Sequence, residues 1–399
     1  MNSITPSDRA QMIKPFRVME ILREAKEFEE KGFDVVHFEV GEPDFTTALP
    51  ITEAGKLALM QGHTSYTQAL GLPELRTRIS EFYKRRSGVE IEPNRIGITS
   101  GASAALNIIF TSLINAGDGI LMTDPGYPCN EAFVQLAGGL AQKIQVDRTS
   151  GFQMSYSMVE RYWNDQTVGL LLSSPSNPTG TIIEQNEFEL INDYVTKREG
   201  FLVVDEIYQG LIFDDAPSSQ MRETALQIDP SIIVVNSFSK YFGMTGWRLG
   251  WFVVPETLIG ILERIAQNTY IAPSSIAQYA ALEAFDPSVL KICEERRLVF
   301  QKRRDLMASL LEETGLSVPQ LPQGAFYIYA DVSMTGKCSE EFCKLLLAKK
   351  HVAVTPGSDF GAYCQGDYVR FAFTTSESQI IEGMKRVKSF VQELIRNAI

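Results

Sequence analysis

The segment of residues 237–250, SFSKYFGMTGWRLG, decides how the rest of the chain is interpreted. It follows the apolar run 232–235, which is typical of a buried strand. Its single lysine, Lys240, therefore comes just after the carboxyl end of a strand, where open α/β sheets bind their ligands. The segment predicts a ligand site at the edge of a sheet.

The residues around Lys240 suit a phosphate group. Ser237 and Ser239 offer small hydroxyl donors, and Arg248 offers a planar guanidinium that is always charged. Lys240 is then free for other chemistry, because an amine beside a phosphorylated aldehyde forms a Schiff base. Pyridoxal 5'-phosphate is the cofactor that needs one lysine, a phosphate site and an acid for its ring nitrogen. From this short motif alone, a solvated loop lysine is an equally good interpretation, since such motifs also occur by chance.

Two more motifs follow apolar runs upstream, residues 174–180 (SPSNPTG) and residues 205–208 (DEIY). With them, the chain resembles the pyridoxal-phosphate-dependent aminotransferases of classes I and II, in the aspartate-aminotransferase-like branch of fold type I. The resemblance extends from residues 41–44 (GEPD) to Arg370, with the motifs in the order of the family. It implies an enzyme that moves an amino group from an L-amino acid to a 2-oxo acid through pyridoxal 5'-phosphate, in amino acid metabolism and biosynthesis.

The composition fits a two-domain enzyme. The 399 residues exceed the usual limit of a single hydrophobic core, and 44% of them are hydrophobic. The net charge of -12 argues against nucleic acid as a partner, because there is no basic excess to meet phosphate backbones. The three histidines, His37, His63 and His351, lie far apart in the sequence and are interpreted as structural or surface residues, not as metal ligands.

We expect a cytoplasmic protein that does not bind membranes. The five scattered cysteines indicate reduced thiols. The N-terminal sequence 1–6 (MNSITP) lacks the basic start and apolar core of a signal peptide, and no apolar run approaches the ~20 residues of a membrane span.

Seven apolar runs from residue 96 onward predict the strands of a large sheet. Most are separated by helix-length segments, which indicates a mostly parallel sheet in an α/β fold, with helices on both faces. The runs are residues 96–99, 120–123, 142–146, 168–173, 201–204, 232–235 and 251–254. The resemblance implies the same seven-stranded sheet for a large cofactor-binding domain, here residues 45–290.

The resemblance implies that residues 1–44 join residues 291–399 in a smaller α/β domain that covers the cleft. A helix is expected over residues 18–31, with Met19, Leu22, Ala25 and Phe28 or nearby positions on its apolar face. The run 35–40 alternates like a strand. A long helix around residues 293–313, strands over 324–329, 351–354 and 368–373, and a final amphipathic helix complete this domain.

Asp205 ends the run 201–204, so its carboxylate can face a pyridine nitrogen and keep it protonated. The other interpretation is an aspartate that caps the next helix. By the resemblance, Asn177 and Tyr208 hydrogen-bond the phenolic oxygen of the cofactor, and Tyr127 stacks on its ring. Alone, Asn177 would only mark a turn, and Tyr127 would only pack within a loop.

The phosphate of the cofactor is expected at the small-residue segment 99–106 (TSGASAAL), because backbone amides at a helix N-terminus favour anions. The residues expected to bind it are Ala102, Ser103, Ser237, Ser239 and Arg248. Tyr66 resembles the tyrosine that reaches the phosphate of the neighbouring subunit, which implies a homodimer with shared active sites.

Arg370 resembles the arginine that binds the α-carboxylate of the substrate. It lies in the apolar run 369–373, where an unpaired charge would be costly, so a functional partner is favoured. By the resemblance, Gly41 lets the main chain approach the same carboxylate, and Asn177 also belongs to this substrate site. Lys240 is expected to move the proton from Cα, with Asp205 and Tyr208 as the other catalytic residues.

The aspartate-specific enzymes of this branch have a lysine where this chain has Ser103, and related dicarboxylate enzymes use an arginine near the position of Tyr270. We therefore expect neutral amino donors, such as alanine-like or aromatic amino acids, unless an arginine such as Arg17 reaches the pocket. Two other functions stay open. One is a β-lyase of sulfur amino acids on the same fold, and the other is a non-catalytic regulatory relative.

Overall fold

A seven-stranded sheet forms the centre of the computed structural model, which describes residues 4–221 and 223–398. Residues 1–3 of the predicted signal-free N-terminus lie outside this description. The strands are β2 (Ile96–Thr99), β3 (Gly119–Asp124), β4 (Leu140–Gln145), β5 (Thr167–Ser173), β6 (Phe201–Asp205), β7 (Ile233–Ser237) and β8 (Gly250–Val253). Their order is β2-β8-β7-β6-β5-β3-β4. The predicted seven strands and α/β fold are confirmed.

Only β8 runs against its neighbours; it is antiparallel to both β2 and β7. The reason is the connection. A parallel strand needs a crossover, usually a helix, whereas residues 238–249 return directly from β7 to β8. The segment that carries Lys240 is therefore the tight link between two adjacent strands.

Helices cover both faces of the sheet, as the apolar character of its strands requires. Side chains alternate along β6, so Leu202 and Val204 join the core on one face and Val203 joins the core on the other. One face is covered by α5 (Ala102–Leu113), α6 (Pro128–Leu136) and α9 (Glu256–Thr269). The other is covered by α4 (Pro73–Ser87), α7 (Tyr156–Tyr162), α8 (Gln185–Lys197) and α10 (Ser275–Ala281), with α3 (Leu49–Met60) packed on α10.

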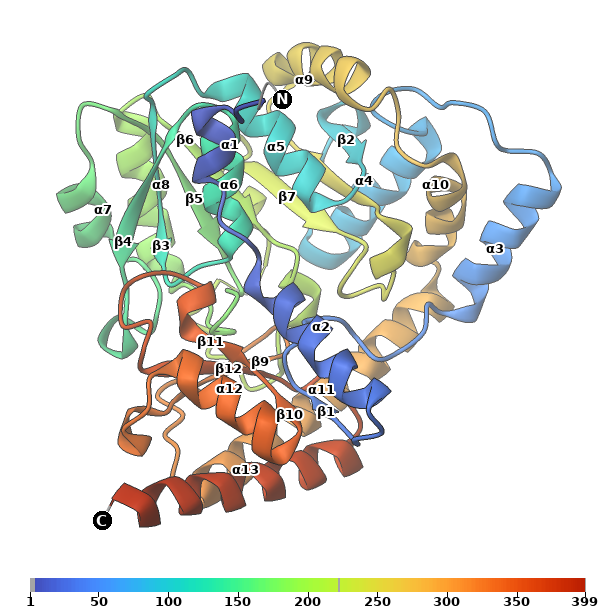
Figure 1. The fold of residues 1–399 in the computed structure, drawn as a ribbon. Coiled ribbons are helices and arrows are strands. Elements are labelled where there is room, and N and C mark those ends of the chain that lie inside the picture. The colour runs from blue at the N-terminus through green and yellow to red at the C-terminus, as the bar shows by residue number, and fades with distance from the viewer. Residues whose placement is uncertain (1–3, 222, 399) are drawn as a thin grey trace.

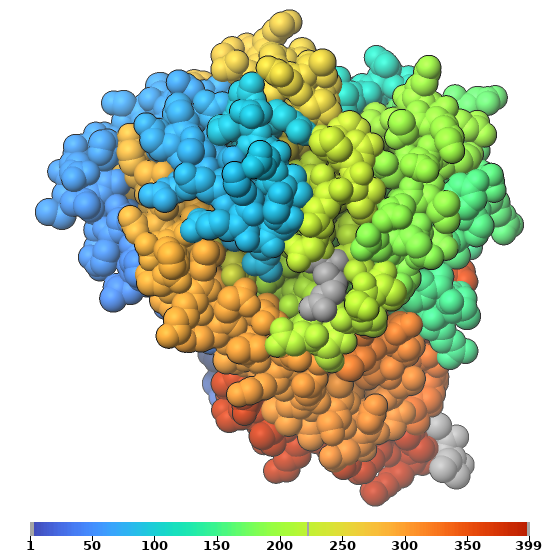
Figure 2. Space-filling view, turned by 180° about the vertical axis from the view of Figure 1, so that it is seen from behind, coloured from blue at the N-terminus to red at the C-terminus, as the bar shows by residue number. Residues whose placement is uncertain are grey.

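A second part lies below the large sheet in Figure 1 and combines a segment from near the N-terminus with the C-terminal segment of the chain. Its strands are β1 (Val36–His37), β9 (Tyr327–Asp331), β10 (Val352–Ala353), β11 (Thr355–Pro356) and β12 (Tyr368–Ala372). Its helices are α2 (Arg17–Glu30), α11 (Pro287–Thr314), α12 (Ser339–Lys350) and α13 (Glu377–Ala398), whereas α1 (Asp8–Met12) packs on α6 beside the large sheet. Strand β1 pairs with β10, and β9, β11 and β12 form an antiparallel sheet. Figure 2 shows from behind how the C-terminal part, in deeper orange and red, forms the lower end of the molecule.

The helix α11 joins the two parts, and its sequence explains where it begins and ends. Asp286 accepts the amide of Ser288, Pro287 occupies the first turn, and Gly315 ends the helix in the left-handed conformation with φ 88°. The domain boundary predicted between residues 290 and 291 falls near the start of this helix, and the division into domains stays a prediction.

The prediction for α2 needs correction in its apolar face. Val18 and Ala25 are buried, with Ile21 and Phe28 also packed inward, whereas Met19 is 57% exposed. Met19 and Leu22 instead line the main pocket. The helix has two apolar surfaces, one that packs on the core and one that lines the pocket. The sequence pattern alone does not distinguish the two surfaces. The strand predicted over residues 35–40 is also shorter, because only residues 36–37 pair as β1.

Candidate active site

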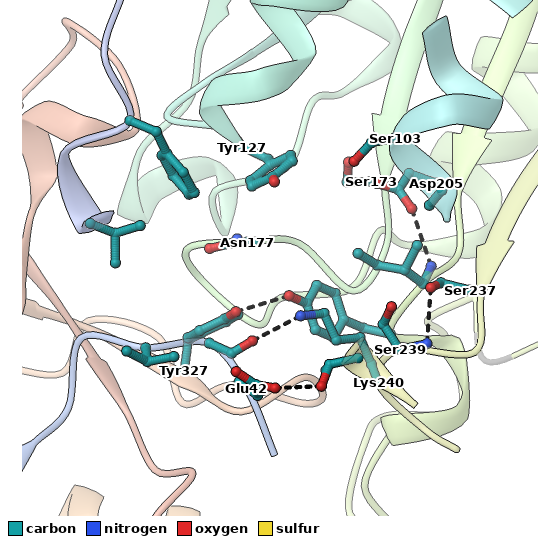
Figure 3. A pocket seen from close by; sticks show the side chains of 18 of the residues that line it. Glu42, Ser103, Tyr127, Ser173, Asn177, Asp205, Ser237, Ser239, Lys240 and Tyr327 are labelled. Carbon is teal, nitrogen blue, oxygen red and sulfur yellow. Dashed lines mark hydrogen bonds between the residues drawn. The ribbon is translucent and has the colours of Figure 1, made fainter. Parts of the chain in front are cut away.

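A cavity of about 330 Å³ lies where β5, β6 and β7 end, and it is closed by segments of the second part (Figure 3). It brings together all but one of the predicted site residues. Those that line it are Gly41, Ala102, Ser103, Tyr127, Asn177, Asp205, Tyr208, Ser237, Ser239, Lys240, Arg248 and Arg370. Tyr66 is the exception: it follows α3, is 79% exposed and does not line the cavity.

Lys240 extends into the cavity from the link between β7 and β8. Its Nζ donates to the carbonyl of Gly41 at 2.8 Å and lies 5.7 Å from the centre of the Phe326 ring. Burial lowers the pKa of Lys240 to about 8; nearby Glu42 opposes this shift, while Arg370 and Arg248 add to it. A lysine with a lowered pKa is a better nucleophile and base near neutral pH.

Asp205 is the last residue of β6 and is buried, with one oxygen accepting the amide of Ile207 at 3.2 Å. Burial raises its pKa to about 7, although Lys240 favours the charged form. A carboxylate in this position would gain much from a cationic partner in the cavity. The bond to Ile207 is also what a local cap would make, so the two interpretations of Asp205 are compatible.

One end of the cavity is shaped for an anion. Helix α5 begins there after Gly101, which has no side chain to cap the free amides of the first turn. A Cβ on Gly101 would lie 2.8 Å from the guanidinium of Arg248, and a Cβ on Gly250 would lie 2.7 Å from the amide of Ala102. Only glycine lets these groups come so close. The hydroxyl of Ser237 accepts the amide of Ser239 at 3.0 Å, which fixes the other wall.

Arg370 lies on β12 and is 3% exposed. Its Nη1 donates to Oδ1 of Asn177 at 2.9 Å, and its Nη2 donates to the carbonyl of Glu39 at 2.5 Å. The guanidinium stacks 4.2 Å from the centre of the Tyr327 ring, and its Nε has no hydrogen-bond partner. Among the described residues no ion pair includes Arg370. A buried cation without an anion is costly, so the geometry favours a carboxylate ligand.

Aromatic side chains form the remaining walls. The hydroxyls of Tyr208 and Tyr327 lie 2.9 Å apart, and burial raises the pKa of both phenols, so both stay protonated donors near neutral pH. Tyr127 meets Phe16 edge to face, with ring centres 6.0 Å apart. All four of these aromatic side chains line the cavity that also holds Lys240 and Arg370.

Sequence reasoning missed several wall residues. They are Phe16, Val18, Met19, Leu22, Val40, Glu42, Leu106, Ser173, Pro175, Ile207, Thr245 and Tyr327. Glu42 belongs to the GEPD motif, which pointed only to Gly41, and its carboxylate accepts the hydroxyl of Thr245. Tyr327 belongs to a predicted strand, but alternation alone does not say which face of that strand meets the cavity.

Arg17 and Tyr270, the two residues considered for binding the far end of the substrate, do not line the cavity. The side chain of Arg17 turns away to Glu340 and Ser358. Tyr270 is also outside the lining, and its buried hydroxyl has no partner. Within the described residues, the cations that line the cavity are Lys240, Arg248 and Arg370.

Residues 34–387 match the family model described as aminotransferase class I and II. The chain belongs to the class I and II aminotransferases. Members of this family use pyridoxal phosphate and move amino groups between amino acids and 2-oxo acids. This aminotransferase has the geometry that such chemistry needs: a lysine, an acid, an anion cradle and a free arginine around one cavity.

Relatives of the aminotransferase carry several substrate names. It is 34% identical to the (5-formylfuran-3-yl)methyl phosphate transaminase of Methanocaldococcus jannaschii, over 97% of this chain and 100% of that one. It is also 34% identical to the valine–pyruvate aminotransferase of Mycobacterium tuberculosis, over 95% and 97% of the two chains. A crystal structure of an aminotransferase from Mycobacterium tuberculosis superposes with a TM-score of 0.93 at 34% identity, covering 98% and 100% of the chains.

These comparisons decide the class of reaction. The enzyme is an amino acid aminotransferase, and nothing in the comparisons favours the alternatives of a β-lyase or a non-catalytic relative. The named substrates of the relatives differ from one another, so they do not give the substrate of this enzyme. No helix within the described residues is long and apolar enough to cross a membrane.

Proposed function

We propose that the aminotransferase binds pyridoxal 5'-phosphate in this cavity and prefers amino donors with neutral side chains. Arg370 is the observation that carries the proposal, because a buried guanidinium without an anion lines the same cavity as an amine of lowered pKa. The cofactor supplies a ring that withdraws electrons from the Cα of the bound amino acid. The residues of the chain supply binding, orientation and proton transfer.

Each site residue has a role that its position supports. Lys240 would hold the cofactor covalently and move the proton at Cα. Asp205 would keep the ring nitrogen protonated, and Asn177 and Tyr208 would donate to the phenolic oxygen. Tyr127 would stack on the ring. The phosphate would bind at the start of α5, and the residues around it are Ala102, Ser103, Ser237, Ser239 and Arg248.

The substrate would bind between this site and α2. Arg370 would bind the α-carboxylate, with Asn177 and the main chain at Gly41 beside it. Phe16, Val18 and Met19 offer an apolar wall to the substrate side chain. A neutral side chain suits this wall, because a second carboxylate would lose water there without gaining a fixed cation.

We also propose a cytoplasmic homodimer that acts in amino acid biosynthesis. All five cysteines are free, which is expected in a reducing compartment. Helix α3 projects from the edge of the molecule in Figures 1 and 2. Leu49, Leu57 and Met60 lie on one side of it and are 67%, 52% and 84% exposed. A second copy of the chain would cover this apolar surface, and Tyr66 beside it would then reach the phosphate of the other subunit.

A panel of amino acids tests the substrate preference. The holoenzyme is mixed with aspartate, glutamate, alanine or phenylalanine, and the absorption change of the half-reaction gives the catalytic efficiency. We expect aspartate not to exceed the best neutral donor. Ser103→Lys should raise the efficiency with aspartate relative to alanine or phenylalanine by about tenfold, because it adds a charged partner. A strong preference of the native enzyme for aspartate would contradict the proposal.

A further inference from the structure

The segment that leads from β1 to the cavity wall at Val40 and Gly41 carries an ion pair. His37 on β1 donates through Nδ1 to Oε1 of Glu39 at 2.7 Å, and its Nε2 lies 3.2 Å from Oε1 of Glu29 on α2. The side chain of Glu39 is fully buried, and its second oxygen has no partner. Within the described part of the chain, His37 is the residue that compensates this buried carboxylate.

The main chain of the same residue holds Arg370. The carbonyl of Glu39 accepts Nη2 of Arg370 at 2.5 Å and the hydroxyl of Thr355 at 3.2 Å. Two residues further on, the carbonyl of Gly41 accepts Nζ of Lys240 at 2.8 Å. A shift of this short segment would therefore move the acceptors of two cations that face the cavity.

The segment is held through its main chain and through one side chain. Phe38 lies between neighbouring strands, since its amide donates to Ala353 and its carbonyl accepts from Ala372. Beyond it the carbonyl of Val40 accepts the hydroxyl of Thr374 at 3.0 Å, and the buried side chain of Glu39 bonds to His37. Removing the positive charge from His37 would leave a buried carboxylate without compensation, which is strongly unfavourable.

The neighbours of the pair bear on how His37 responds to pH. Glu29 on α2 adds a second negative charge beside His37, and Arg370 on β12 faces the carbonyl of Glu39. The neighbours on β10 and β11, Ala353 and Thr355, carry no charge. The hydrogen bond to Glu39, and then the charges of Glu39 and Glu29, raise the pKa of His37 to about 9 against the effect of burial.

We propose that His37 and Glu39 form a positioning pair that holds the Arg370 guanidinium in place for the substrate carboxylate, and that loss of the His37 proton weakens carboxylate binding. The pair touches neither substrate nor cofactor. It acts through the Glu39 carbonyl. This inference rests on the proposed function, because it requires Arg370 to bind the substrate.

Carboxylate binding to the holoenzyme provides the test. The probe is 3-phenylpropanoate, which has no amino group and stays ionised throughout the range. Its Kd is measured by calorimetry from pH 7 to pH 10 for the native enzyme, His37→Gln, Glu39→Gln and Glu29→Gln. Thermal unfolding of each variant is followed in parallel. Other groups of the holoenzyme can titrate in the same range, so the informative quantity is the difference between a variant and the native enzyme at each pH.

We expect the native affinity to fall by about tenfold as His37 loses its proton, since one charge-assisted contact is weakened. His37→Gln should bind about tenfold more weakly at pH 7 and show no such fall relative to the native enzyme. Glu39→Gln should bind within about threefold of the native enzyme at pH 7 and also lack the fall, because it has no charge to compensate. Glu29→Gln should still lose affinity for the probe as the pH rises.

Turnover separates positioning from general damage. In His37→Gln, KM should rise while kcat stays within about threefold, because the reacting atoms are untouched. If His37→Gln and Glu39→Gln keep the native affinity and the native pH profile, the inference is overturned. If His37→Gln fails to fold, Glu39→Gln and Glu29→Gln still decide the result. Arg370→Lys tests the proposed function separately: native affinity in that variant would overturn the role of Arg370 itself.

Discussion

At the scale of single residues, burial shifts the pKa values of Lys240 and Asp205 in opposite directions, and each shift favours the uncharged side chain. It lowers the pKa of Lys240 to about 8 and raises the pKa of Asp205 to about 7. Each side chain therefore changes its charge near neutral pH. A bound cofactor with a cationic ring nitrogen would return Asp205 to its ionised form.

Lys240→Ala should lower the rate of the half-reaction with a good amino donor by roughly a thousandfold, because the variant lacks both the amine that holds the cofactor and the group that moves the Cα proton. The change of absorption after mixing with L-phenylalanine or L-alanine measures this rate. Lys197→Ala, at an exposed position on α8, is the matched control and should behave like the native enzyme. Full activity of Lys240→Ala would remove Lys240 from the mechanism.

Asp205→Asn should stabilise the cofactor-free protein at pH 8 while slowing the holoenzyme. The folded pKa of about 7 exceeds the value of about 4 in the unfolded chain, so the folded state holds this proton more tightly. Stability from Asp205 is present below about pH 4 and is lost as the pH rises to 7, by roughly 4 kcal/mol. Denaturant unfolding at pH 4 and pH 8 measures the loss of stability, and Asp205→Asn should make this loss smaller by about that amount.

Glu206→Gln is the matched control for Asp205→Asn. Glu206 is also buried, with its pKa raised to about 8 chiefly by burial, but it bonds to Thr224 and Ala225 and does not line the cavity. It should give the same kind of gain in stability and leave the turnover number unchanged. Equal turnover in both variants would show that Asp205 has no electronic role.

The charged site residues could be predicted from the apolar runs themselves, whereas uncharged ones such as Asn177 and Tyr208 were predicted from the resemblance to the family. Lys240, Asp205 and Arg370 each lie in or beside an apolar run, where a charge needs an explanation. Tyr327 gave no such signal, since a tyrosine in a strand is ordinary. Glu39 was hidden for a different reason: its carbonyl, which holds Arg370, is a main-chain group that every residue has.

At the scale of elements, α2 is shared between the core and the cavity. Its Val18 reaches both, and Leu22 lines the cavity while Ala25 packs inward. The strands were predictable because each is a short apolar run with a boundary on both sides. Their order was not, since it depends on which runs pair across the sheet, and neither was the lining role of α2, which depends on how two parts of the chain meet.

Leu22→Ala should reduce the catalytic efficiency with phenylalanine about tenfold and with alanine much less, because a large apolar side chain loses contact area that a methyl group never reached. The ratio of the two efficiencies, measured in the half-reaction, is the readout. Arg23→Ala is the control, since Arg23 is the exposed neighbour on the same helix turn. Equal losses with both donors would place the substrate side chain elsewhere.

At the scale of the whole molecule, the cavity is assembled from distant segments. Residues of the large sheet supply Lys240 and Asp205, and the second part supplies Gly41 and Arg370. Two bidentate ion pairs tie α11 to other segments, Arg303 to Asp44 and Arg304 to Asp215. Tyr66 lies outside this cavity, and we propose that it contributes to the site of a second subunit instead.

Mixing two variants, each impaired at limiting cofactor, tests the shared site. Tyr66→Ala should lower cofactor affinity by roughly ten- to a hundredfold, the loss expected for one hydrogen bond to a phosphate, so it is assayed at limiting cofactor. Lys240→Ala is inactive but keeps Tyr66. If Tyr66 serves the other subunit, a mixed dimer contains one site with Lys240 from one chain and Tyr66 from its partner.

Random exchange makes roughly half of the dimers mixed, each with one complete site, so about a quarter of the native activity should return on mixing. The two variants are unfolded together and refolded, and activity is compared with that of each variant refolded alone. Adding Leu57→Glu and Met60→Glu to both chains should prevent dimer formation in sedimentation and abolish this recovery, whereas Leu190→Glu, at an exposed leucine of α8, should not. If mixing restores nothing while native dimers form, Tyr66 acts within its own chain or not at all.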